Sequence, residues 1–351
     1  MADTARRAFV ATVVAGSVIV VALALWKLRL VLGLVFMAFI IAAAIRPGID
    51  WLARHRVPRP AGLALHYLAF LGVIVALLAL AVPRARDQVD LALSPKGKAE
   101  ISRAAQHSTG IKHDVLIALR KRLDHLPKSS RLVKPATTIG VKAFEVLIGI
   151  FFTFAAAAYW IFERDKTIDL VSSLLPRPRR KLVRDTWTLI DLKLGAFVRG
   201  QALLIALVGT VLSLAFWAIG EPYWILIGSF AGLVEIVPVI GPLAAGALAI
   251  GVGFTASIQT AVAAGGCVLA VRLLEDYLIM PRVIGDAVGL SPLLVLVSVT
   301  AIGILFSGWA VLFAVPIAAV VVTLFDVILR DVDPAEQDVP TVLFPAKESE
   351  A

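Results

Sequence analysis

The sequence has few charged residues and almost no cysteine. Asp, Glu, Lys and Arg together make up 17% of the 351 residues, whereas soluble globular domains carry about 25%. Apolar residues make up 60% and the mean hydropathy is +0.91, which excludes an ordinary soluble domain and indicates a protein with several membrane spans. The single cysteine, Cys267, excludes an intramolecular disulfide and lies in an apolar run, where a thiol packs as a small hydrophobe.

The motifs of common catalytic and metal sites are also missing. No Gly-rich phosphate-binding loop of the Walker type occurs, so ATP is not expected to drive the protein directly. No Ser-His-Asp or Cys-His arrangement stands out at membrane depth. The sequence therefore predicts no enzyme, no catalytic residue, no metal site and no cofactor. The histidines, none of which has metal-ligand spacing, are His55, His66, His107, His113 and His125.

The basic balance of the chain points to a membrane surface. Lys and Arg outnumber Asp and Glu by 34 to 25, which gives a net charge of +9. A basic excess can mark a nucleic-acid-binding protein, but in a chain this apolar it is typical of cytoplasmic loops held beside anionic lipid headgroups. We therefore expect the lipid bilayer as a partner, and no nucleic acid.

Apolar runs of membrane-spanning length follow one another along the chain. A helix needs about 20 apolar residues to cross the hydrocarbon core, because every backbone amide must be satisfied internally. The first run follows Arg6 and Arg7, as in a signal peptide, but no small-residue cleavage site follows it, so a retained span is expected. The predicted runs cover residues 8–26, 30–45, 61–82, 139–162, 198–219, 222–256, 258–280, 290–306 and 308–329.

Positive charges orient these spans in the membrane. Residues 46–62 hold four arginines and residues 164–193 hold eight Lys or Arg residues, so both segments are expected in the cytoplasm with the N- and C-termini. An apolar stripe over residues 179–197 fits either a helix in the headgroup plane or a linker helix docked on the cytoplasmic ends of the bundle. The predicted units are N-terminal spans (1–82), an extramembrane helical subdomain (83–138), a fourth span with the amphipathic helix (139–197), a transport core (198–330) and a mobile tail (331–351).

The longest apolar run, residues 222–256, cannot be one straight spanning helix. Its 35 residues would measure about 52 Å as an α-helix, against a hydrocarbon core of about 30 Å. Pro238 and Pro242 lack an amide proton, and Gly241 permits backbone angles that other residues avoid. The chain is therefore predicted to break between residues 237 and 242 and to form a re-entrant hairpin, of the kind with which transporters bind substrate.

Glu235 is the only charged residue of this run, and it lies just before the predicted break. A carboxylate in hydrocarbon costs several kcal/mol, so its side chain is expected to face a cavity, a cation or a partner side chain. The alternative is a polar residue at the membrane–water boundary, where the cost is small. The depth of the hairpin tip decides between the two.

A second group of charged residues interrupts the apolar run 258–280. Arg272 and Glu275 are three residues apart and share a helix face, so they either neutralise each other or act together on a substrate. Asp276 has no evident partner in this helix. Together with Glu235, these three residues form the predicted substrate- or ion-binding site.

Proline and glycine then predict a second interruption. Pro281 ends the helix, and Gly285 and Gly289 make the following loop flexible. Residues 290–306 and 308–329 form two apolar arms around a turn. Two interrupted segments in comparable positions indicate a site near the membrane midplane in a secondary carrier.

Several motifs stand out in the second half of the chain and after the second span. The long segments are FVRGQALLIALVGTVLSLAFWAIGEPYWILIGSFAGLVEIVPVIGPLAAG and EDYLIMPRVIGDAVGLSPLLVLVSVTAIGILFSGWAVLFAVPIAAVV, and the N-terminal one is IAAAIRPGIDWLARHRVPRPAG. In combination they resemble the AI-2E transporter family, also called the autoinducer-2 exporter family of bacterial permeases. The likeness covers nearly the whole chain and is weakest over residues 84–134. Its short motifs are Arg199-Gly200-Gln201, residues 237–242, Pro281 to Gly285, and Gly289-Leu290 with Pro292.

The resemblance implies a multi-helix carrier of the bacterial inner membrane that assembles as a homo-oligomer, such as a pentamer. With the runs above, it predicts an all-α integral membrane protein of about eight transmembrane helices, with two Pro/Gly-interrupted re-entrant-type hairpins and a small helical extramembrane segment. Some family members are associated with export of the quorum-sensing signal autoinducer-2, and others with sodium or lithium exchange for protons. Family motif positions are taken by Glu235, Pro238, Gly241, Pro242, Glu275, Pro281, Gly285 and Pro292.

The chain departs from the family pattern at Arg272, where Gln is frequent, and at Asp276, where Gly or Asn is frequent. One cation with two or three carboxylates suits a cation or an anionic solute as well as a neutral one. The leading hypothesis is a secondary permease that exports a small polar solute or signalling molecule, coupled to an ion gradient. The alternatives are a sodium or lithium/proton antiporter, and an oligomeric channel or scaffold in which the hairpins line a pore or mediate packing.

Overall fold

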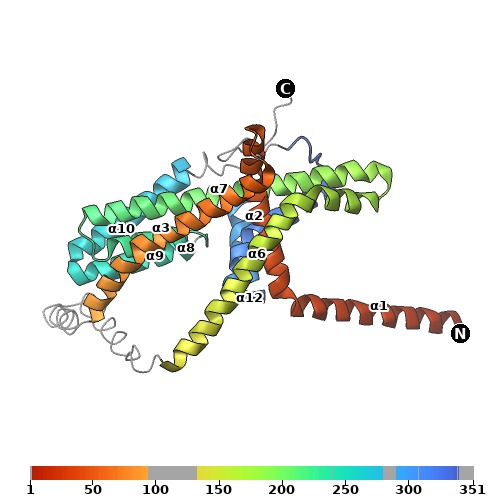
Figure 1. Ribbon diagram of the computed structural model, residues 1–351. Coiled ribbons are helices and arrows are strands. Elements are labelled where there is room, and N and C mark those ends of the chain that lie inside the picture. Colours follow the sequence, from red (N-terminus) through yellow and green to blue (C-terminus); the bar gives the residue numbers. More distant parts are fainter. Residues whose placement is uncertain are drawn as a thin grey trace.

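The structure, a computed structural model, describes residues 2–93, 133–238, 240–279, 290–306, 308–337 and 339. Within these ranges the chain is helical and contains no strand (Figure 1), which confirms the predicted all-α class. The elements are α1 (Ala2–Lys27), α2 (Arg29–Arg54), α3 (Arg59–Leu93), α6 (Val133–Ser173), α7 (Arg177–Ala218), α8 (Trp224–Val234), α9 (Ile240–Ala256), α10 (Ile258–Leu274), the π-helix η2 (Glu275–Ile279), α12 (Pro292–Leu305), the 3-10 helix η3 (Gly308–Phe313) and α13 (Ala314–Leu329).

Three predicted features lie wholly or partly outside the described residues. The extramembrane subdomain was expected over 83–138, and α3 and α6 account only for its two ends. The loop with Pro281, Gly285 and Gly289 falls in residues 280–289. The tail was expected over 331–351, of which 331–337 and 339 are described. These predictions therefore stay predictions.

Among the described residues, five helices are long and apolar enough to cross a membrane. Their outer faces carry exposed large apolar side chains, such as Phe9 on α1, Phe151 on α6 and Ile328 on α13, as expected of surfaces that face lipid. The apolar helices α8, α9 and α12 are shorter than a full span. The predicted total of about eight spans thus stays a prediction. The five candidates are Phe9–Lys27, Arg29–Arg54, Phe144–Ser173, Arg177–Ala218 and Gly308–Leu329.

Helix α2 joins the N-terminal part of the chain to the rest of the bundle. α1 projects away from the other helices at the lower right of Figure 1. α2 buries Ala38 and Ala42 against Ala157 of α6, and its Ile40 packs in a cluster with Leu194 of α7. Small residues at these contacts let the helix backbones approach closely.

Helix α7 is a single helix of 42 residues. The stripe over residues 179–197, expected as a separate amphipathic helix, is its N-terminal part and continues without a break through residue 198, where the transport core was expected to begin. This half of α7 runs back along the C-terminal half of α6 and forms with it an arm that projects at the upper right of Figure 1. Leu189 and Leu194 of the apolar stripe are buried against other helices, whereas Leu182 near its N-terminal end is exposed.

The C-terminal half of α7 packs with α8, α9 and α10 into a four-helix bundle. Val208, Leu212 and Phe216 of α7 are buried in one core cluster with residues of the other three helices. α8 lies so close to α7 that a Cβ added at Gly232 would stand 2.6 Å from the carbonyl oxygen of Ile205. Gly228 is in similar contact with Ser213 and completes a Gly-x-x-x-Gly pattern, which is typical of tightly packed membrane helices.

The predicted break in the long apolar run is confirmed. α8 ends at Val234 and α9 begins at Ile240, so the break lies two to three residues earlier than predicted. Pro242 belongs to the first turn of α9, where its missing amide proton would have had no intrahelical partner. The chain turns so tightly that a Cβ at Gly241 would overlap the carbonyl oxygen of Val234. α8 and α9 pack against each other as the arms of a hairpin, whose depth in a membrane stays a prediction.

The two apolar arms predicted after residue 289 lie close to their predicted bounds. α12 begins at Pro292, with Ser291 as its N-cap, and ends at Leu305. The 3-10 helix η3 and α13 then form the second arm. Pro316 stands in the first turn of α13 for the same reason as Pro242 in α9.

Candidate functional site

The four residues of the predicted substrate- or ion-binding site come together beside the break between α8 and α9. Glu235 follows the last residue of α8 and is buried. Its backbone carbonyl accepts a hydrogen bond of 2.9 Å from the side-chain amide of Gln201 on α7, which satisfies one of the carbonyls that a helix C-terminus leaves without a partner. Its side chain faces Arg272 of α10, at 3.3 Å from Oε1 to Nη1.

Arg272 contacts three carboxylates. Its Nη1 lies 3.3 Å from Oε1 of Glu235 and 3.3 Å from Oε2 of Glu275. Its Nη2 lies 2.9 Å from Oδ1 of Asp276, one helical turn along the chain. The expectation that Asp276 lacks a partner in its own helix was wrong, because the guanidinium has donors enough to serve all three carboxylates at once. We call Glu235, Arg272, Glu275 and Asp276 the core cluster.

The core cluster has an interior side and an exposed side. The side chains of Glu235 and Glu275 are 6% and 3% exposed, whereas those of Arg272 and Asp276 are 31% and 42% exposed. Oε1 of Glu235 and Oε2 of Glu275 both lie 3.3 Å from Nη1 of Arg272, so these two buried carboxyl groups stand side by side. Two neighbouring carboxylates repel each other, and a proton on either one relieves that repulsion. The cluster thus combines one fixed cation with three acidic groups.

A change of helix type accompanies the cluster. α10 stops at Leu274 and the chain continues as the π-helix η2, which contains Glu275 and Asp276. The predicted single helix over 258–280 is therefore two elements in its described part. π-helical turns are rare and occur frequently at functional sites, because the extra residue alters which side chains share a face.

The other motif residues have different surroundings. Arg199 of α7 points to α2, where its Nη1 lies 3.2 Å from the carbonyl oxygen of Ala44, and so it connects two helices away from the core cluster. Pro292 is the first residue of α12. Pro238, Gly241 and Pro242 shape the α8–α9 turn. The motif thus divides into residues that bear charge and residues that shape the backbone.

A second group of charged side chains lies where the α6–α7 arm meets α2. Arg164 of α6 is buried and donates through Nε to Asp191 of α7, and its Nη1 lies 2.8 Å from Oδ1 of Asp165. Arg46 of α2 lies 3.6 Å from the same oxygen of Asp165. We call Arg46, Arg164, Asp165 and Asp191 the arm cluster. It holds two cations and two carboxylates.

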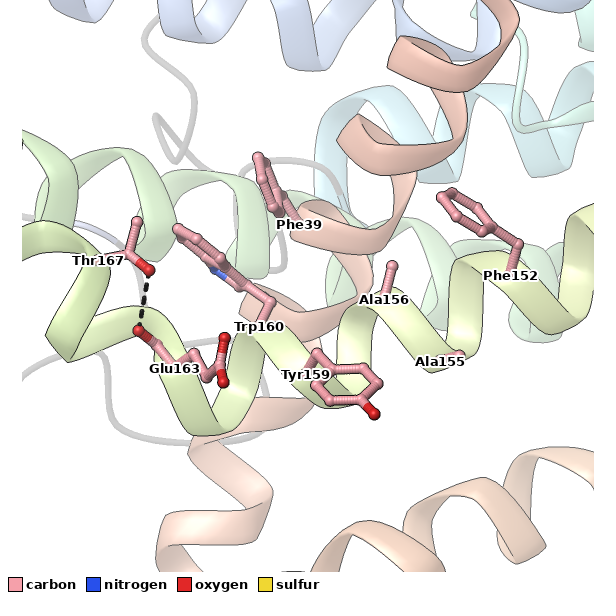
Figure 2. A pocket seen from close by; sticks show the side chains of 8 residues that line it. All are labelled: Phe39, Phe152, Ala155, Ala156, Tyr159, Trp160, Glu163 and Thr167. Atoms are coloured by element: carbon pink, nitrogen blue, oxygen red, sulfur yellow. Dashed lines mark hydrogen bonds between the residues drawn. The ribbon is translucent and has the colours of Figure 1, made fainter.

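Two apolar pockets are lined by residues that belong to neither cluster. One, of about 430 Å³, lies between α2 and α6 and is lined by Phe39, Tyr159 and Trp160, with Glu163 and Thr167 at one end (Figure 2). The other, of about 510 Å³, is bordered by α1, α2, α12, η3 and α13. Neither contains a residue of the core cluster, so the predicted site is a cluster at a helix break rather than a large apolar cavity.

Sequence reasoning missed several buried polar residues. Lys193 of α7 donates to Thr323 of α13 at 3.2 Å, and both are buried. Glu221, between α7 and α8, is also buried. Arg164 and Asp191 are 27 residues apart and on different helices, so no periodicity within one helix could pair them. For Glu221, the available signal was a carboxylate flanked by apolar residues on both sides.

Comparisons with known proteins support the carrier interpretation. Over 306 residues the chain is 24% identical to "Putative transport protein YrrI" of Bacillus subtilis, which covers 83% of this chain and 86% of that protein. Over 309 residues it is 26% identical to "Putative transport protein MT0215" of Mycobacterium tuberculosis, covering 84% and 82% of the two chains. It is 27% identical to "Putative permease PerM" of Escherichia coli over 161 residues, or 45% of each chain.

The family match covers the N-terminal helices, the α8–α9 break and the core cluster alike. Residues 16–330 match the family described as "AI-2E family transporter", a range that runs from α1 to the end of α13. The residues that meet at Arg272 therefore belong to the matched region, and transport is the general activity that the relatives' names state. By this match over most of its length, the chain belongs to the AI-2E transporter family.

Proposed function

We propose that this protein is a secondary transporter that exports a small polar solute or signalling molecule and uses the core cluster to couple that movement to an ion gradient. The observation that carries the proposal is the meeting of three carboxyl groups with one guanidinium at a helix break. Ionisable groups inside a membrane bundle are costly and mark substrate or ion pathways. Broken helices supply the irregular backbone that such sites use.

The chemistry of the cluster favours a proton as the coupled ion. Oε1 of Glu235 and Oε2 of Glu275 contact the same guanidinium nitrogen, so one proton bound by either carboxyl group relieves their repulsion. When that proton leaves, both carboxylates are anionic beside a single guanidinium, and their mutual repulsion opposes the compact arrangement. Gain and loss of the proton thus bias the position of the α8–α9 tip relative to α10, which is the differential interaction that alternating access requires.

The excess of carboxylates over cations also favours a second candidate. With three acidic groups around Arg272, a sodium or lithium ion can replace the proton, and the protein would then exchange protons for these ions. The two candidates share the site and differ in the transported species. We propose further that the protein resides in the bacterial inner membrane as a homo-oligomer with both termini in the cytoplasm, as the basic segments around residues 46–62 and 164–193 favour.

Flux measurements in proteoliposomes test the role of the cluster. The full chain is reconstituted with an internal pH dye, and proton movement is recorded after a sodium, lithium or autoinducer-2 gradient is imposed. We expect flux in the wild type and a reduction of about tenfold or more, equivalent to about 1.4 kcal/mol, in Glu235→Gln and Asp276→Asn. Glu163→Gln is the matched control, because this exposed carboxylate lies on α6 in the pocket of Figure 2.

The outcomes separate the candidates. Proton movement driven by sodium or lithium alone favours the antiporter, and movement that requires the signalling molecule favours the exporter. Undiminished flux in both cluster variants removes these residues from the mechanism. Unitary currents in planar bilayers would instead favour a channel.

A further inference from the structure

Glu221 is a buried acidic residue at the other end of the α7–α10 bundle. It lies between α7 and α8 and is 2% exposed. Its backbone amide donates to the carbonyl of Phe216 at 2.9 Å, which fixes the residue beneath the C-terminus of α7. The 11 residues of α8 separate it from the α8–α9 tip, a length of roughly 16 Å. Glu221 and the core cluster therefore occupy opposite ends of the same helices.

The side chain of Glu221 is enclosed without a hydrogen-bond partner. In the part of the chain that the structure describes, neither Oε1 nor Oε2 has one. Gly253 of α9 borders the carboxyl group so closely that an added Cβ would stand 3.1 Å from Oε2, and the same Cβ would stand 2.7 Å from Cα of Ala261. The thiol of Cys267 on α10 interacts electrostatically with the carboxyl group of Glu221. Tyr223 follows Glu221 two residues later in the chain.

An ionised carboxylate that is enclosed without hydrogen bonds is unfavourable. Binding a proton is the change that neutralises it with the smallest rearrangement. Desolvation of an ionised carboxyl costs several kcal/mol unless a cation or donors compensate it. A metal cation would itself need several oxygen ligands, whereas the carboxyl group of Glu221 lies beside Gly253 of α9 and within electrostatic reach of the Cys267 thiol. A proton needs no further ligand and removes the charge.

We propose that Glu221 is a second proton-binding site, at the end of the bundle opposite the core cluster. This inference goes beyond the proposed function, because it concerns equilibrium protonation and does not require the protein to move a solute. In its protonated form Glu221 allows α7, α8, α9 and α10 to close around it. In its ionised form it adds an unpaired negative charge to that contact.

The proposal has a consequence for stability against pH. Burial raises the pKa of Glu221 to about 7 from its ordinary value of 4.5. Since the folded protein then binds the proton more tightly than the unfolded chain does, the stabilisation is fully present below about pH 4.5 and is lost as pH rises through about 7. Glu221→Gln keeps the shape of the protonated side chain without a titrating proton. We therefore expect it to melt at the same temperature as the wild type at low pH, and at a higher temperature above pH 7.

Infrared spectroscopy of the full chain in nanodiscs tests the site directly. Spectra recorded from about pH 5 to about pH 9 report the C=O band of protonated carboxyl groups. The difference between wild type and Glu221→Gln should contain a band that disappears with a midpoint near pH 7. The same band should persist in Glu235→Gln, so the result does not depend on whether the core cluster drives transport.

Two results would overturn the proposal. One is superimposable titrations of wild type and Glu221→Gln, which would mean that Glu221 keeps one protonation state throughout this range. The other is a melting difference between the two proteins that does not change with pH. If Glu221→Gln fails to fold, Glu221→Asp serves in its place, and it should shift the midpoint of the band, whereas an unchanged midpoint would contradict the assignment.

Discussion

The arm cluster and the core cluster are built from the same kinds of side chain but differ in charge balance. In the arm cluster, Arg164 and Arg46 face Asp165 and Asp191, and Asp50 with Arg59 extends the group through Arg46, so cations and carboxylates are equal in number. In the core cluster, Arg272 alone faces three carboxylates. A balanced group can remain ionised at all times and hold helices together. An unbalanced group needs a proton or another cation to neutralise it, so it responds when that proton or cation binds or leaves.

The two clusters also differ in the regularity of the backbone around them. The arm cluster joins uninterrupted helices, α2, α6 and α7. The core cluster lies where α8 stops and where α10 changes into a π-helix. Backbone that is irregular at a site usually accompanies function rather than stability. We infer that the arm cluster is structural and that the core cluster carries transport, and the following substitutions test that division.

Removing Arg164 should have the largest effect on stability. Arg164→Met leaves Asp191, whose side chain is 15% exposed, without its main cation. We expect a loss of about 3–5 kcal/mol in the free energy of unfolding, because one partner of a buried pair remains uncompensated. Flux per folded molecule should stay at the wild-type level. Denaturant unfolding in detergent and the proteoliposome assay measure the two quantities.

Arg184→Met is the matched control for that experiment. Arg184 pairs with Asp169 on the same arm, but their side chains are 52% and 65% exposed. An exposed pair contributes about 0–1 kcal/mol, so this variant should be nearly neutral. Equal losses in both variants would show that the arm cluster is not held by its buried pair.

Removing one acidic group should have opposite consequences in the two clusters. Asp191→Asn takes away a charged hydrogen-bond acceptor from Arg164 and should cost about 1.5–3 kcal/mol, with flux retained. Glu275→Gln relieves repulsion among the carboxylates at Arg272. It should change stability by less than about 1 kcal/mol while reducing flux about tenfold or more. If the two variants behave alike in both assays, the contrast in charge balance has no functional meaning.

Close packing behind the core cluster should matter more than packing elsewhere in the same hairpin. Gly232→Ala places a methyl group 2.6 Å from the carbonyl oxygen of Ile205 and forces α8 away from α7, at a cost of about 1–3 kcal/mol. Gly251→Ala of α9 meets nothing within 4 Å and should be neutral or slightly stabilising. Thermal melts of the two variants, at one scan rate, provide the comparison.

Gln201 should show the smallest effect. Gln201→Ala removes the 2.9 Å hydrogen bond to the carbonyl of Glu235 and should cost about 1 kcal/mol. Because that bond fixes the tip that carries Glu235, flux should fall although no charge is lost. A stability loss with unchanged flux would mean that the bond supports the fold only.

Much of the fold could be predicted from apolar run length and from proline. The run 222–256 is too long for one span and contains two prolines, so a break was required, and it occurs close to the predicted place. The position of Pro242 inside α9 was not anticipated, because a proline in the first helical turn needs no amide proton. The prediction divided α7 at residue 198 from the distribution of charge and not from helix-breaking residues. The continuity of this helix was therefore missed.

The residues of the site could be predicted from the sequence, but their arrangement in space could not. Unpaired charges in apolar runs identified Glu235, Arg272, Glu275 and Asp276. Their common contact with one guanidinium depends on how α8 and α10 pack, which no single-helix pattern encodes. Glu221 was missed because one carboxylate between two apolar runs looks like an ordinary loop residue until three other helices are placed around it.

Because α7 is one uninterrupted helix, a tilt near the core cluster is transmitted to its N-terminal end. Gln201 lies beside the core cluster, and Arg177, 24 positions earlier in the same helix, lies at the far end of the arm. That distance is about 36 Å, so a tilt of about 5° at Gln201 displaces the arm's tip by about 3 Å. A small change of tilt at the core cluster would therefore become a larger displacement at this distant basic end of α7, and a molecule bound there would in turn restrain the core cluster.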